Sequence, residues 1–165
     1  MFREANARID LRSVALTNLS DLRNQPSVVI GAFDNVWTKE LTAGLRFSFS
    51  RDEAADTQWI VDARNPTKRQ WQVVDTTSTT AAPEDYAIVG RFRHPLTGQL
   101  VVVVAGLTQF GTTAAGDFVS SPALMEELNR LPQKDWEKKN LQIVLATRLV
   151  RSEAAPAHIV ASHVW

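Results

Sequence analysis

The chain has no cysteine among its 165 residues, and its 18 basic and 18 acidic side chains leave no net charge. Without cysteine it has no disulfide framework, no thiolate ligand for zinc and no cysteine nucleophile. A neutral balance without a basic cluster argues against nucleic-acid binding through this domain, because such binding depends on grouped Lys and Arg. The longest apolar run, at 100–107, falls well short of the roughly 20 residues that span a bilayer, so we expect no membrane insertion by this chain.

Histidine is also scarce, with three residues, and no complete catalytic motif is present. His94 lies in a predicted turn, while His158 and His163 have an odd separation that places them on opposite faces of a strand. There is no G-x-S-x-G sequence, and the segment 106–116 lacks the Gly-Lys-Ser/Thr ending of a phosphate-binding loop. The sequence therefore predicts no catalytic residue, no metal site and no cofactor, and it does not by itself identify a function.

A strand–loop–helix pattern at 27–45, SVVIGAFDNVWTKELTAGL, is the most informative feature that is present. An apolar run that does not alternate predicts a buried strand at 27–31, which is followed by a polar turn. Trp37, Leu41 and Leu45 then recur every four residues, as on one face of a helix. A weaker copy of the pattern, VVVVAGLTQFGTTAAGDF, follows later in the chain.

Two pairs of apolar segments predict β-hairpins. Segments 86–93 and 99–105 flank the turn sequence HPLTG, and segments 142–150 and 157–164 flank a second short connection. The other expected elements are strands at 13–16, 46–50, 58–61 and 71–74, helices at 20–24 (capped by Ser20), 36–45 and 112–131 (broken at Pro122), and a loop at 75–84.

Helices that interleave with apolar strands favour an α/β fold with a mixed β-sheet and helices packed on it. The two hairpins would add antiparallel members to a sheet of roughly six to eight strands. We expect one compact domain over residues 1–165, with 1–11 as a flexible remnant of a preceding segment.

The candidate site is the pair of loops at 31–38 and 106–113. Ligands of open α/β sheets bind beyond the carboxyl ends of the strands, and each loop also leads into a helix N-terminus whose free N–H groups attract anions. If the preceding strands are parallel neighbours, the two loops face each other across a crevice suited to a small polar or anionic ligand. Its expected residues are Asp34, Asn35, Trp37, Thr38, Thr108, Gln109, Gly111, Thr112 and Thr113.

Structural explanations exist for several of these residues, and other functions stay open. Asp34 and Asn35 are common in turns and helix caps, Trp37 shares a helix face with core residues, and Gly111 suits close helix packing. One alternative function is a nucleotide- or nucleoside-processing enzyme that uses Asp34 or Glu40 in the same crevice. Another is a protein-interaction scaffold, or homodimer, that pairs through an edge strand at 157–164.

The segments GAFDNVWT and GTTAAGDF carry motifs of the form G-x-x-x-N-x-W-T and G-T-x-A-A-G-[DE]-F. With IVDARNP, DYAIVGRF and WEKKNLQIVLATRLV, they make the chain resemble an uncharacterised bacterial α/β domain. That domain forms the C-terminal, sensor-like region of larger proteins, some with an N-terminal winged helix-turn-helix or a membrane segment. The resemblance implies a non-catalytic ligand-binding or sensory module, either cytoplasmic or exported as part of a membrane-anchored protein.

Overall fold

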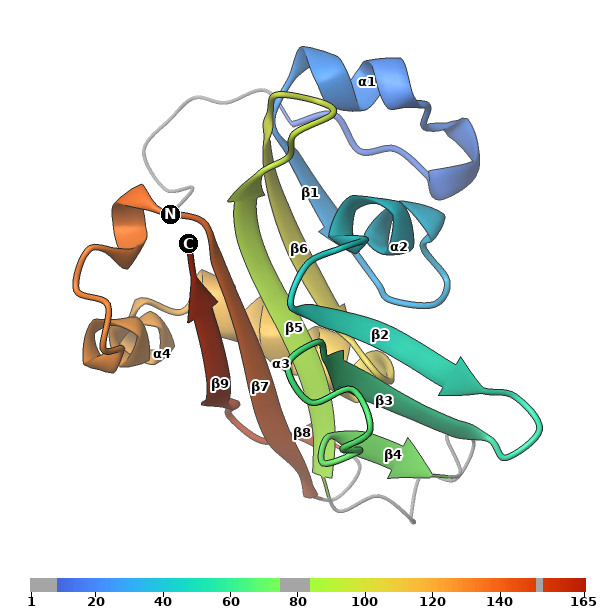
Figure 1. The fold of residues 1–165 in the computed structure, drawn as a ribbon, viewed down its shortest axis with the longest axis vertical. Coiled ribbons are helices and arrows are strands. Elements are labelled where there is room, and N and C mark those ends of the chain that lie inside the picture. Colours follow the sequence, from blue (N-terminus) through green and yellow to red (C-terminus); the bar gives the residue numbers. More distant parts are fainter. Residues whose placement is uncertain (1–8, 75–83, 151–152) are drawn as a thin grey trace.

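A mixed β-sheet forms the centre of the structure, a computed structural model that describes residues 9–74, 84–150 and 153–165 (Figure 1). Its strands in spatial order are β1 (Ser27–Ile30), β6 (Leu100–Gly106), β5 (Glu84–Arg93), β7 (Leu141–Val150) and β9 (His158–Val164), with the short β8 (Glu153–Ala154) also paired to β7. The β1–β6 pair is parallel and the other pairs are antiparallel. The predicted α/β fold with a mixed sheet is confirmed.

Additional layers cover both faces of this sheet. One face packs against helix α3 (Gln109–Ser120), which is followed by α4 (Pro122–Met125). The other face packs against helix α2 (Val36–Thr42) and a second, antiparallel sheet. The strands of that second sheet are β2 (Phe47–Asp52), β3 (Thr57–Asp62) and β4 (Gln72–Val74). The remaining helices are α1 (Leu19–Asn24) and three single 3-10 turns at Val14–Leu16, Glu126–Arg130 and Trp136–Lys138.

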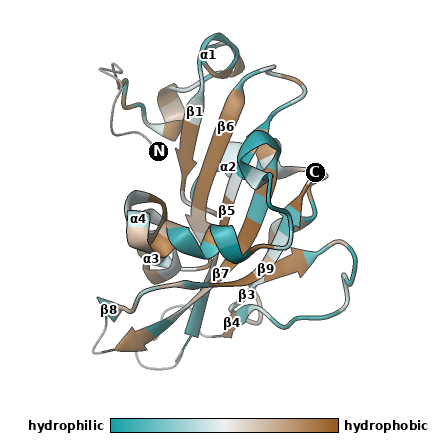
Figure 2. Cartoon of the chain, turned by 90° about the vertical axis from the view of Figure 1, so that its left-hand side faces the viewer, coloured by the Kyte–Doolittle hydropathy of each residue, from teal (hydrophilic) through white to brown (hydrophobic). Residues whose placement is uncertain are grey.

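Coverage on both faces explains why the central strands are apolar without alternation. In β6, Val102 and Val104 pack into the cluster under α3, while Val101 and Val103 pack into the cluster on the α2 side. Figure 2 shows β6 as hydrophobic over most of its length. A strand with one solvent-facing side would instead alternate apolar and polar residues.

Two polar contacts fasten the second sheet to the first. Gln142 of β7 is completely buried; its side-chain amide donates to Phe47 O at 2.9 Å and accepts from Phe47 N at 3.1 Å, as a neighbouring backbone would. Arg46 forms a bidentate ion pair with Asp62, with Nε 2.9 Å from Oδ1 and Nη2 2.8 Å from Oδ2. The Arg46 guanidinium also donates to Ser162 O in β9. The hydrogen bond from Arg46 lowers the pKa of Asp62.

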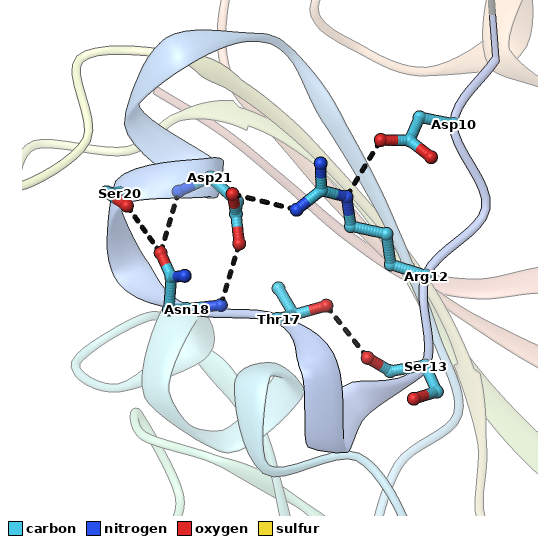
Figure 3. Close-up of polar contacts among 7 residues, drawn as sticks. All are labelled: Asp10, Arg12, Ser13, Thr17, Asn18, Ser20 and Asp21. Carbon is cyan, nitrogen blue, oxygen red and sulfur yellow. Dashed lines mark hydrogen bonds and ion pairs between the residues drawn. The ribbon is translucent and has the colours of Figure 1, made fainter.

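The expected first strand at 13–16 is wrong, because this segment forms a 3-10 turn with no buried residue. The segment SVAL pairs with no strand among the described residues, and without a partner its extended form gains no hydrogen bonds. Arg12 lies beside this turn and forms ion pairs with Asp10 and Asp21, both at 2.8 Å (Figure 3).

The N-cap of α1 is Asn18 rather than the expected Ser20. Asn18 Oδ1 accepts from Asp21 N, and the Asp21 carboxylate accepts in return from Asn18 N, which together form a capping box (Figure 3). Ser20 lies inside the helix and donates to Asn18 Oδ1 at 2.5 Å. Both residue types are good caps, so the sequence pattern alone placed the helix start too late.

The strand at 27–31 is present as β1, but it is not fully buried. It forms an edge of the large sheet, with Val29 in the core and Val28 and Ile30 exposed by 48% and 60%. The reason is that α3 covers the central strands and leaves the same face of β1 open to solvent.

Both predicted hairpins are confirmed, as is the helix break at Pro122, and the structure shows Ser121 as the cap of α4. A bulge in β9, opposite Val144 and Leu145 of β7, brings His158 and His163 onto the same face instead of opposite faces. No described helix is long and apolar enough to cross a membrane. Of the expected loop at 75–84, residues 75–83 lie outside the described residues and Glu84 begins β5; of the expected flexible start at 1–11, residues 1–8 lie outside them.

Candidate functional site

The parallel pairing of β1 with β6 brings the carboxyl ends of both strands to one edge of the sheet (Figure 1). The loops that leave these ends lie side by side there, around an open cavity of about 450 Å³. The second sheet contributes one residue to the cavity, Gln58 of β3. The lining consists of Ile30, Gly31, Ala32, Phe33, Asp34, Gln58, Gly106, Leu107, Thr108, Gln109, Thr112 and Thr113.

The nine expected site residues divide into two groups. Those that line the cavity are Asp34, Thr108, Gln109, Thr112 and Thr113. Those outside its lining are Asn35, Trp37, Thr38 and Gly111. Glu40, the other acid considered for catalysis, is exposed on α2 and also lies outside the lining.

Asn35 and Thr38 hold the junction between β1 and α2 in place. Asn35 Oδ1 accepts from Trp37 N at 3.1 Å as the helix cap, and its Nδ2 donates to Ile30 O at 2.9 Å. The Thr38 hydroxyl donates to Gly31 O at 2.5 Å and is buried. Because these polar groups already have partners within the protein, the two side chains support the loop rather than contact a ligand.

Trp37 belongs to the hydrophobic core. It is partly buried and packs against the cluster that contains Leu41, the residue one turn further along α2. Its indole Nε1 is buried without a hydrogen-bond partner in the described part of the chain. The core explanation for Trp37 is therefore the one that the structure supports.

Asp34 differs from its neighbours because its carboxylate is exposed and has no hydrogen-bond or ion-pair partner within the described residues. It lies close over Gly31, where an added Cβ would be 2.6 Å from Asp34 Oδ1. Gly31 also has a φ of +93°, which favours glycine. Among the described residues that line the cavity, Asp34 is the single charged side chain.

The junction between β6 and α3 is organised by Asp85, a buried residue of β5 that the sequence analysis did not select. Its carboxylate accepts from Thr108 Oγ1 at 2.5 Å, Gly111 N at 2.6 Å and Tyr86 N at 2.7 Å. Burial raises the pKa of Asp85, and these hydrogen bonds oppose that shift. The anion at the N-terminus of α3 is thus a carboxylate of the protein itself.

Two glycines allow α3 to lie very close to the strands. A Cβ on Gly106 would be 2.2 Å from Thr112 N, and one on Gly111 would be 2.8 Å from Tyr86 O. Thr112 fills the remaining space, since its hydroxyl accepts from Gly106 N at 2.9 Å and donates to Thr108 O at 3.1 Å. Gly111 and Thr112 are therefore packing residues of the junction.

Gln58 and Phe33 are lining residues that the sequence analysis missed. The side-chain Oε1 of Gln58 is buried and has no hydrogen-bond partner among the described residues. The Phe33 ring packs edge-on against Phe49, with 5.8 Å between ring centroids, and the guanidinium of Arg51 lies over it. No local signal could identify Gln58, because the contact of β3 with this edge depends on how the two sheets pack.

Two side chains of the lining carry an acceptor without a partner among the described residues: Asp34, whose carboxylate is exposed, and Gln58, whose Oε1 is covered by neighbouring atoms. They lie beside an apolar wall. In the part of the chain that the structure describes, no three His, Asp or Glu side chains are grouped as metal ligands. No protein family, curated protein or solved structure gives a significant match to this chain.

Proposed function

We propose that this domain binds a small polar ligand, without catalysis, in the cavity between the loops at 31–38 and 106–113. The observation that carries the proposal is the parallel β1–β6 pair. It places two strand-to-helix loops side by side, and an open cavity of about 450 Å³ lies between them. This is the usual position of a ligand in open α/β sheets, and the volume lies within the common range of ligand pockets. In a larger polypeptide, such a module would act as a sensor.

The charges favour a ligand that is not anionic where it meets Asp34. An anion would be repelled by this unpaired carboxylate. The N–H group of Gly111 is not free to attract it, because Asp85 already accepts that hydrogen bond. These contacts favour a neutral or cationic polar ligand over the anionic one that the sequence analysis also allowed.

Binding is favoured over catalysis because, among the described residues, Asp34 is the single titratable side chain in the lining. Nucleophilic and general acid–base catalysis need a second positioned group within hydrogen-bond reach. In the alternative enzyme, Asp34 would have to act without Glu40, which lies outside the cavity.

A ligand screen by thermal shift, with a variant that fills the cavity, tests this function. Thr113→Phe places a ring at an exposed lining position, and Ser120→Phe places the same ring on α3 outside the lining. We expect stabilising compounds to lose their effect on Thr113→Phe and to keep it on Ser120→Phe. Compounds that stabilise both variants equally, or a broad screen without any stabilising compound, would contradict the proposal.

Pairing through an edge strand is the second candidate, and the exposed apolar residues of β1 favour that edge over β9. β9 carries a bulge, a feature that protects edges from pairing, whereas β1 has none. Sedimentation of Val28→Lys and Val160→Lys, matched substitutions on the two edges, tests this. A dimer that only Val28→Lys dissociates supports β1 pairing, and a monomeric wild-type protein excludes it.

A further inference from the structure

We infer that the cavity selects a small organic ammonium ion with an apolar body, bound through Asp34 and Gln58. This inference rests on the proposed function and names the chemical class of its ligand. It follows from which polar groups of the cavity already have partners and which do not.

Asp34 supplies the charge that such a ligand needs. Its carboxylate lines the cavity, is exposed and has no partner in the described part of the chain. A carboxylate is an acceptor only, so it is satisfied by N–H or O–H donors, and a charged donor gives the stronger bond. An ammonium group supplies both the donors and the opposite charge.

Gln58 supplies a second acceptor at the same cavity. Its Oε1 is buried without a partner among the described residues, an arrangement that costs free energy in the unliganded protein. Because neighbouring atoms cover Oε1, the Gln58 side chain must turn toward the cavity before a ligand donor can reach it, and the new hydrogen bond would then remove that cost. An ammonium has three donors and no acceptor, so it can bond to Asp34 and Gln58 together.

The wall of the cavity is suited to an apolar body attached to the charged head. Ile30, Phe33 and Leu107 line it from both loops. The nearby guanidinium of Arg51 lies over Phe33 and forms an ion pair with Glu53 at 2.6 Å, so its charge is balanced within the protein.

The same geometry discriminates against an anion of equal size. The N-terminus of α3 could otherwise attract one, but Asp85 accepts from Thr108 Oγ1 and Gly111 N and so occupies that position. An anionic head would then meet the Asp34 carboxylate without a compensating donor.

Three indole compounds with different head groups provide the test: tryptamine as the cation, tryptophol as the neutral alcohol and indole-3-propionate as the anion. Titration calorimetry at neutral pH and low salt would measure their affinities for the full chain. We expect tryptamine to bind at least about tenfold more tightly than tryptophol, and indole-3-propionate to bind most weakly, because a hydrogen bond between two charged groups is stronger than one with a neutral partner.

Variants then assign the selectivity to the two acceptors. Asp34→Asn should remove the preference for tryptamine, whereas Glu40→Gln, which removes one exposed acid outside the lining, should retain it. Gln58→Met should weaken tryptamine binding several-fold while leaving the unliganded protein as stable as before or more so, because it removes a buried acceptor without a partner. A purely structural role for Gln58 would lower stability instead.

The outcomes separate this inference from the proposed function. Equal or tighter binding of the alcohol or the anion, with amide NMR shifts at Asp34 and Thr113, would overturn the ammonium class and keep the cavity as a binding site. Unchanged tryptamine affinity in Asp34→Asn would also overturn it. If none of the three compounds binds and the wider screen finds no ligand that Thr113→Phe excludes, both proposals fail.

Discussion

The two strand-to-helix junctions of this protein use an aspartate in opposite ways. At the β6–α3 junction, the buried Asp85 accepts three hydrogen bonds and fastens the helix to the sheet. At the β1–α2 junction, Asn35 caps the helix, and Asp34 is left exposed without a partner in the described part of the chain. The difference teaches that an acid near a helix start can either hold the fold together or stay free to bind a ligand. Which of the two it does depends on whether the rest of the fold supplies hydrogen-bond donors to it.

The largest expected loss of stability comes from a substitution that disrupts the close packing of the β6–α3 junction. Gly106→Ala should destabilise the protein by about 3 kcal/mol or more, because the new Cβ would lie 2.2 Å from the backbone nitrogen of Thr112. Gly116→Ala, inside α3, meets nothing within 4 Å and should stabilise the protein by about 0.4–1 kcal/mol. Denaturant unfolding would measure both changes; a mild effect of Gly106→Ala would show that α3 can move away from the strands.

Removal of the two aspartates compares the junctions directly. Asp85→Ala should cost about 2–3 kcal/mol, because it leaves the buried donor of Gly111 and the partly buried donor of Thr108 without their acceptor. Asp34→Ala should change stability by less than about 0.5 kcal/mol. Thermal and denaturant unfolding of both variants would check this contrast, and equal costs would contradict the division between a structural and an available acid.

Asn35→Ala tests the cap of the other junction. It should cost about 0.5–2 kcal/mol, because Trp37 N loses its acceptor, and it should leave the affinity for a cavity ligand unchanged. Asn35→Asp keeps that acceptor and loses the donor to Ile30 O, so it should recover part of the stability. A large loss of ligand affinity in Asn35→Ala would instead place this side chain in the binding site.

The smallest expected effect is the pH dependence of two buried acids. Burial raises the pKa of Asp85 above the ordinary value of 3.8, so the stability that its protonation contributes is lost as pH rises through the folded-state pKa. The Arg46 hydrogen bond lowers the pKa of Asp62 below 3.8, so its contribution is lost as pH falls through that pKa. Denaturant unfolding from acid to neutral pH would measure the loss of unfolding free energy in each variant. As pH rises, this loss should shrink for Asp85→Asn and grow for Asp62→Asn. The same pH dependence in both variants would contradict the opposite pKa shifts of the two acids.

Much of the fold was accessible from local patterns. The hairpin at β5–β6 follows from two apolar segments around HPLTG, and the break before α4 follows from Pro122 behind a good cap. The sequence analysis placed two facing loops at one sheet edge on the condition that their strands are parallel neighbours, and the β1–β6 pair meets that condition. Two of the errors, the strand at 13–16 and the full burial of β1, concern segments whose surroundings the local sequence does not encode.

The sequence by itself determined the α/β class, most elements and the edge of the sheet where two loops meet, because apolar periodicity and turn residues act over a few neighbouring positions. Tertiary structure alone decided which polar groups at that edge are free. Asp85 reaches Gly111 across 26 positions, and Gln142 joins Phe47 across 95. Hydrogen-bond satisfaction depends on such distant partners, so only the folded chain separates Asp34 and Gln58 from the polar residues that hold the loops together.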